Sequence, residues 1–193
     1  MINVFLSASI PLPGRDERYL RSVDLTLVRE AIRALVVSLI EIRGHLVFGG
    51  HPAITPMLGT LYEDFGYSPR EMVTLYQTEY YRKVFPRENS KFGRVVVTPD
   101  VGDREQSLSL MRSRMLTDAP IQKGVFVAGM DGVVEEFHKF VEIYGLEAAL
   151  PLSSTGGAAK VIFDENLSIR RSIGTELTYL SLFREEFSNL RRS

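Results

Sequence analysis

Short apolar runs alternate with longer amphipathic stretches along most of this chain. A continuous apolar run bounded by small or polar residues is typical of a strand covered on both faces, whereas apolar residues three and four positions apart are typical of a helix. The pattern predicts strands at 2–6, 46–48, 71–77, 94–97, 124–128 and 149–152. We therefore predict an α/β protein with a three-layer, Rossmann-like fold, in which helices flank a mostly parallel central sheet.

The limits of several helices can be read from capping residues. Asp24 is a suitable N-cap for a helix that reaches residue 42, and Gly44 would end it. Another helix should begin near Asp131, directly after a glycine turn, and end at Gly145. Apolar residues at helical spacing predict a last helix at about 173–190.

Small and hydroxylated residues follow four of the predicted strands. Parallel strands bring their carboxyl ends to one edge of the sheet, where ligands bind in open α/β folds. Amides at glycine-rich helix starts, together with nearby hydroxyls, suit phosphate or ribose. The candidate nucleotide-binding residues from this pattern are Ser7, Ser9, Gly49, Gly50, His51, Gly129, Met130, Asp131, Gly132, Thr155, Gly156 and Gly157.

Each of these segments also has a plainer interpretation. Residues 7–9 would serve equally as an ordinary polar turn, and 153–159 as a small-residue helix start packed tightly on the sheet.

The polar segment 11–22, with two prolines, is a candidate flap over the site. Aromatic and basic residues interleave at 80–85 (YYRKVF), which could stack on a base, but we expect them to pack a loop against the body.

Composition narrows the class of protein. A chain of 193 residues suits one domain, spanning 1–193, with a substantial core. The net charge of −1 argues against the broad basic surface that DNA or RNA binding requires. There is no cysteine, and the three histidines lack metal-ligand spacing, so we expect no metal site. No apolar run reaches membrane length, so we expect a cytoplasmic protein without a membrane partner.

The stretch 111–136 resembles the SLOG (LOG/DprA-like) superfamily, which is related to the TRPM-SLOG and STALD groups. LOG-type phosphoribohydrolases carry M-H-x-R-K, a strand, and then P-G-G-x-G-T-x-x-E. Residues 111–115 read MRSRM here, and residues 128–136 read AGMDGVVEE. The family's L-V-Y-G-G-G motif is similar to LVFGG at 46–50, with His51 in place of the third glycine. The resemblance implies that Arg114 and Glu136 are the functional arginine and glutamate of a nucleotide site.

Two functions follow from this resemblance. The first is a sensor that binds a nucleotide or an NAD-derived signal, such as a cyclic ADP-ribose, in prokaryotic defence or signalling, beside a TIR or Sir2-type partner. The second is a phosphoribohydrolase-like enzyme that cleaves an N-glycosidic bond, with Arg114 and Glu136 as catalytic residues. The loss of the family's proline, second glycine and threonine favours the sensor. By the same analogy we expect a homodimer. We also expect that the protein uses no cofactor.

Overall fold

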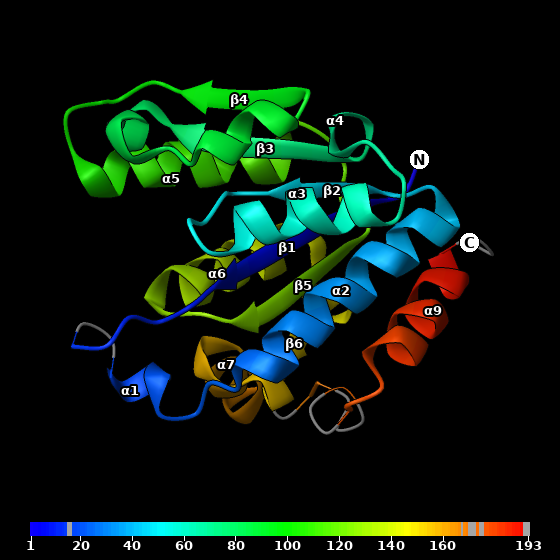
Figure 1. The fold of residues 1–193 in the computed structure, drawn as a ribbon. Coiled ribbons are helices and arrows are strands. Elements are labelled where there is room, and N and C mark those ends of the chain that lie inside the picture. Colours follow the sequence, from blue (N-terminus) through cyan, green and yellow to red (C-terminus); the bar gives the residue numbers. More distant parts are fainter. Residues whose placement is uncertain (15–16, 167, 170–172, 174–175, 191–193) are drawn as a thin grey trace.

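Six strands form one sheet in the computed structural model of the chain (Figure 1), in the order β4-β3-β2-β1-β5-β6. Every neighbouring pair is parallel, so the predicted α/β, Rossmann-like fold with a parallel sheet is confirmed. The structure describes residues 1–14, 17–166, 168–169, 173 and 176–190. The strands are β1 (Asn3–Ser9), β2 (His45–Phe48), β3 (Val73–Thr78), β4 (Arg94–Thr98), β5 (Lys123–Ala128) and β6 (Ala149–Leu152).

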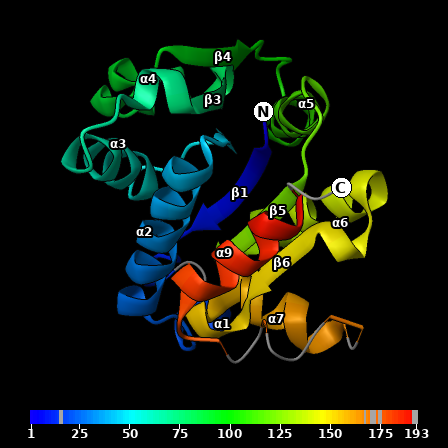
Figure 2. The same ribbon diagram turned by 90° about the vertical axis from the view of Figure 1, so that its right-hand side faces the viewer.

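Helices cover both faces of this sheet. Figure 2 shows α2 (Leu25–Ile42) and α3 (Ile54–Asp64) on one side, and α5 (Arg104–Thr117) and α6 (Asp131–Tyr144) on the other. The other elements are α1 (Glu17–Leu20), α4 (Pro69–Met72), α7 (Gly157–Glu165), α9 (Tyr179–Leu190), η1 (Glu79–Val84), η2 (Arg87–Lys91), η3 (Leu146–Ala148) and η4 (Ser153–Thr155). Across the described part of the chain, no helix is both long and apolar enough to span a bilayer.

The last predicted helix, 173–190, falls partly outside the described residues. In its described part Ile173 is buried, as predicted, and α9 begins at Tyr179 and packs along α2. Leu177, which the helical pattern placed on the buried face, lies before α9 and is 61% exposed. The prediction of one continuous helix is therefore wrong at residues 176–178, which have no helical conformation, whereas Ile173, Phe183 and Phe187 are buried as predicted.

A cluster of phenylalanines joins α6 to the middle of the sheet. The rings of Phe5 and Phe140 stack with centroids 5.9 Å apart, and the ring of Phe126 meets both edge-on. All three side chains are fully buried. A Cβ at Gly124 would lie 2.8 Å from the Phe140 ring, so glycine at this position lets α6 pack closely on β5.

Strand β1 is longer than the sequence pattern indicated. The predicted strand ended at residue 6, whereas β1 continues to Ser9, which pairs with Ala128 of β5. Residues 7–9 are therefore strand and not a polar turn. The extension places Ser7 inside the sheet, 1% exposed, with its hydroxyl directed at α6.

Candidate functional site

The site lies at the carboxyl ends of β1 and β5. From β1 the chain builds outward through β2, β3 and β4, and then returns to the other side of β1 to form β5. The connections leave β1 and β5 in opposite directions, which opens a crevice for ligands at such switch points. Helix α6 begins immediately beyond β5, so its first amides lie at this crevice.

Glu136 occupies the centre of the site. Its Oε2 accepts a hydrogen bond from the hydroxyl of Ser7 at 2.6 Å, and its Oε1 lies 3.4 Å from Nε of Arg112. Only 15% of the Glu136 side chain is exposed. Burial raises the pKa of this carboxyl group, although Arg112 and Ser7 both act to lower it.

Arg112 is the arginine that reaches Glu136. Its side chain is 9% exposed, and one Nη group also pairs with the carboxylate of Glu135. A Cβ at Gly132 would lie 2.9 Å from the other Nη, so the guanidinium lies directly against the first turn of α6. The guanidinium thus lies beside a helix N-terminus, which favours an anion, and it is already paired with the carboxylates of Glu135 and Glu136.

Arg114, the arginine implied by the family motif, lies elsewhere. Its guanidinium makes two hydrogen bonds with Asp118, at 2.7 and 2.9 Å, and its side chain is 49% exposed. Asp118 also accepts a hydrogen bond from Tyr76. Two positions along a helix turn a side chain by about 200°, so only one of Arg112 and Arg114 can face α6. The structure does not bring Arg114 to Glu136.

The turn between β5 and α6 needs glycine. Gly129 has a φ of +92°, and a Cβ there would lie 2.3 Å from the Val133 side chain. Met130 is the N-cap of α6 and provides no side-chain hydrogen bond to the helix, while Asp131 stands in its first turn. The amides in the first turn of α6 therefore have no N-cap side chain to which they donate a hydrogen bond.

The loop that follows β6 forms hydrogen bonds with other parts of the chain. The hydroxyl of Thr155 donates to the carbonyl of Leu152 at 2.7 Å and accepts from the amide of Ala128 at 2.8 Å. The amide of Gly156 bonds within its turn, and the amide of Gly157 bonds the Ser22 hydroxyl at 3.0 Å. These three predicted binding residues thus form a tightly packed helix start, the plainer of the two interpretations of this segment.

Gly156 also permits a close chain crossing. A Cβ at this residue would lie 1.8 Å from the carbonyl oxygen of Ser22, and its φ is +77°. The segment between α1 and α2 therefore runs across the start of α7. Ser22 and Gly156, more than a hundred positions apart in the sequence, are therefore in close contact beside the loop after β6.

The loop after β2 packs against the neighbouring elements. A Cβ at Gly49 would lie 3.2 Å from Sδ of Met115, and one at Gly50 would lie 2.2 Å from Nε2 of Gln77. The ring Nδ1 of His51 accepts a hydrogen bond from the amide of Ala53 at 3.2 Å, near the start of α3. Burial lowers the pKa of His51 to about 4, so the ring is neutral at pH 7.

Part of the predicted flap lies over the start of α6. Tyr19 of α1 is 2% exposed, and its hydroxyl donates to Asp131 at 2.6 Å. Arg18 pairs with the same carboxylate. Burial, followed by the contact with Asp131, raises the pKa of Tyr19 to about 12. Helix α1 has only four residues, too few to show a helical pattern of apolar positions. The sequence therefore did not identify Arg18 and Tyr19 as candidate residues.

A separate hollow lies at the opposite end of the sheet. It has a volume of about 320 Å³ and is lined by the starts of β5 and β6 together with α9. Lys123 and Glu186 form an ion pair of 2.9 Å in its wall. Because Lys123 begins β5 whereas the candidate site follows its end, this hollow is not part of that site.

Comparison with known proteins places these features in a family. A profile of the SLOG cluster3 family matches residues 18–187. The X-ray structure of TM1055, a Northeast Structural Genomics Consortium target, superposes with a TM-score of 0.59 at 13% identity. The match covers 100% of this chain and 99% of that one, and at this identity it shows a shared fold. A search of curated proteins found no match.

Proposed function

The chain belongs to the SLOG cluster3 family, and we propose that it binds a nucleotide or an NAD-derived nucleotide signal of the cyclic ADP-ribose type. Family membership supports a nucleotide-related function, either binding or a phosphoribohydrolase-like activity. The proposed site is the crevice at the ends of β1 and β5. We extend the proposal to a prokaryotic defence or signalling role with a TIR or Sir2-type partner, as the family resemblance implies.

One observation carries the choice of binding over catalysis. Both carboxylate oxygens of Glu136 are held by donors of the chain itself, Ser7 on one oxygen and Arg112 on the other. A carboxylate that stabilises a ribosyl cation must present an oxygen to the sugar. Glu136 instead orients Arg112 beside the start of α6, which is the role of a supporting residue in an anion site.

The site offers complementary groups for a phosphate. Arg112 supplies the Nη that lies against the first turn of α6, since its Nε and its other Nη pair with Glu136 and Glu135. The first turn of α6 supplies amides and the positive end of the helix dipole. Asp131 carries negative charge at the same helix start, but Arg18 and Tyr19 engage its carboxylate. Their contacts reduce the repulsion that a phosphate would otherwise meet there.

A second candidate is a hydrolase of the phosphoribohydrolase type. The raised pKa of Glu136 favours it, since a buried carboxyl group that retains its proton nearer to neutral pH is suited to general acid catalysis. In that case Glu136 would exchange its contact with Ser7 for one with the ribose or a water molecule. The two candidates differ in whether the ligand leaves the site intact.

The deciding experiment is mass spectrometry of retained and released compounds. Purified protein is incubated with AMP, NAD, ADP-ribose and cyclic ADP-ribose isomers, and bound compounds are separated by filtration. We expect one compound to be retained intact, and an Arg112→Ala variant to retain none. Release of free base with a ribose phosphate, lost in Glu136→Gln, would instead establish the hydrolase. Retention of no compound by the wild-type protein would reject both candidates.

A further inference from the structure

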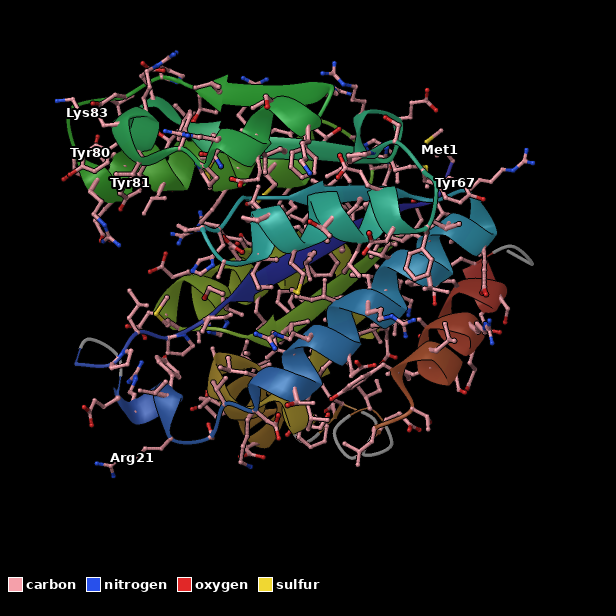
Figure 3. All side chains as sticks on the ribbon, viewed as in Figure 1. Met1, Arg21, Tyr67, Tyr80, Tyr81 and Lys83 are labelled. Atoms are coloured by element: carbon pink, nitrogen blue, oxygen red, sulfur yellow. The ribbon has the colours of Figure 1, made fainter. Side chains whose placement is uncertain are left out.

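An exposed aromatic group lies at the same edge of the sheet as the proposed nucleotide site. Figure 3 shows Tyr80, Tyr81 and Lys83 gathered at one end of the molecule, with Tyr67 at the other end. Tyr80 and Tyr81 belong to η1, which follows the carboxyl end of β3. Tyr80 is 40% exposed, so part of its ring is accessible to solvent.

The pair of rings is held in a fixed arrangement. Tyr80 and Tyr81 meet edge to face, with centroids 5.0 Å apart and planes at 82°. The hydroxyl of Tyr81 accepts a hydrogen bond from Nε of Arg104 at 2.8 Å, and Arg104 is the first residue of α5. Tyr81 is therefore anchored to α5, and it supports Tyr80, whose ring remains open to solvent.

This group connects physically to Arg112. Arg104 and Arg112 stand eight residues apart on α5, a rise of about 12 Å along the helix. Because Tyr81 bonds Arg104, the two rings lie at the N-terminal end of the helix that carries Arg112, about 12 Å along the helix axis from that residue.

The charges around Tyr80 also suit a nucleotide. Arg82 pairs with Glu79, and Arg104 pairs with Glu105. Within the described part of the chain no ion pair is recorded for Lys83, one residue before the 65% exposed Val84. An exposed ring beside an unengaged cation is a common setting for base stacking near a phosphate backbone.

We propose that Tyr80 stacks on the base of the nucleotide whose phosphate lies at Arg112, so that the base lies exposed at the edge of the site. This inference rests on the proposed function and adds the part of the ligand that the β1–β5 crevice does not contact. It assigns the aromatic segment a role in binding, where the sequence favoured simple packing of a loop. Stacking requires an open ring face and no particular hydrogen bond, so Phe or Trp would replace Tyr80.

The test compares ligands with and without a base. AMP, ADP-ribose and ribose 5-phosphate are titrated by calorimetry against the wild-type protein, Tyr80→Ala, Tyr80→Phe and a control, Tyr67→Ala. Tyr67 is 46% exposed and lies at the other end of the sheet (Figure 3). We expect Tyr80→Ala to weaken AMP and ADP-ribose roughly ten- to a hundredfold, with ribose 5-phosphate unchanged within about twofold. Tyr80→Phe and Tyr67→Ala should match the wild type.

The outcomes separate failure of this inference from failure of the proposed function. If Tyr80→Ala binds AMP and ADP-ribose as the wild type does while Arg112→Ala does not, the stacking role is overturned and the phosphate site stands. If Tyr80→Ala weakens ribose 5-phosphate equally, the residue acts through structure and the inference also fails. If the wild type binds none of the three compounds, the proposed function fails and this inference fails with it. Thermal melting of each variant checks that its fold is intact.

Discussion

The hydroxyl of Ser7 lies 2.6 Å from Oε2 of Glu136, although 129 positions separate the two residues in the chain. The contact joins the end of β1 to the second turn of α6, across the point where the order of strands reverses. It fixes one oxygen of a buried carboxylate, and Arg112 takes the other. The proposed phosphate site therefore depends on three residues from three different elements.

Arg112 and Arg114 form a matched pair for testing the site. We expect Arg112→Ala to weaken nucleotide binding roughly ten- to a hundredfold, because a charge-assisted hydrogen bond to phosphate is worth about 1.5–3 kcal/mol. Arg114→Ala, which removes only the exposed pair with Asp118, should bind within about twofold of the wild type. Calorimetric titration of both variants checks this. The reverse order of effects would return the site to the arginine of the family motif.

Ser7→Ala should lower stability in a pH-dependent manner. The Ser7 hydroxyl favours the charged form of Glu136, whose pKa is already raised by burial, so its loss raises that pKa further. A raised carboxyl pKa lowers stability as pH rises through the folded value. We therefore expect a loss of about 1–2 kcal/mol at pH 7 and a smaller loss at pH 4. Urea unfolding at the two pH values measures it.

Ser9→Ala is the control for this variant. Ser9 lies two residues further along β1, and the described residues include no recorded hydrogen bond to its hydroxyl. Its free energy of unfolding should change by less than about 0.5 kcal/mol at either pH. An equal loss in both variants would show that the serines act through strand packing and not through Glu136.

Thr155 should be structural and not a ligand contact. Thr155→Val removes a fully buried hydroxyl that bonds the carbonyl of Leu152 and the amide of Ala128. Leaving that amide buried without a partner costs about 1–3 kcal/mol. We expect a lower unfolding free energy in Thr155→Val and little change in Thr155→Ser, with nucleotide affinity retained by the folded protein in both. Loss of affinity in a stable variant would restore the phosphate role.

His51 should make the protein less stable in acid. Burial lowers its pKa from 6.5 to about 4, so the folded state favours the neutral ring and stability falls as the pH drops from about 7 towards 4. At 1.36 kcal/mol per unit, this shift corresponds to roughly 3 kcal/mol. His51→Asn keeps an acceptor near the amide of Ala53 and cannot titrate. Its unfolding free energy, subtracted from that of the wild type at each pH, should isolate this contribution.

If the difference between wild type and His51→Asn is constant between pH 7 and pH 4, then His51 does not carry the acid sensitivity. His45 provides a comparison, since its pKa is also lowered, by burial first and by the charge of Arg94 last. His45→Asn lies at the opposite end of β2 and should leave the acid response of His51 intact.

The strands and their order of appearance were largely predictable from hydrophobic pattern. Residues 149–152 form β6 as predicted, and Asp24 caps α2 through hydrogen bonds to the amides of Thr26 and Leu27. These features depend on neighbours in sequence, which is why local pattern suffices. Strand β1 was predicted too short, because its last residues are held by pairing with β5, more than a hundred positions away.

The candidate site was predictable in place but not in detail. The predicted glycine turns after β2 and β5 lie at one edge of the sheet, and Glu136, to which the family motif pointed, lies in α6 close to that edge. The motif could not decide between Arg112 and Arg114, since both lie within two positions on one helix and only the packing of α5 against α6 selects the one that reaches Glu136. Tyr19 gave no signal, because its burial depends on a contact with Asp131, 112 positions away.

The sequence by itself thus determined most of the elements, the parallel sheet and the edge at which the candidate residues lie, because those follow from local hydrophobic periodicity and from glycine. Only the tertiary structure decided which polar groups remain available to a ligand. Thr155 and Gly157 form hydrogen bonds with other parts of the chain, whereas Arg112 pairs with Glu135 and Glu136 and keeps one Nη against the start of α6. Hydrogen bonds between segments far apart in the sequence occupy some polar groups and not others, and these bonds form only when the helices and the sheet pack together.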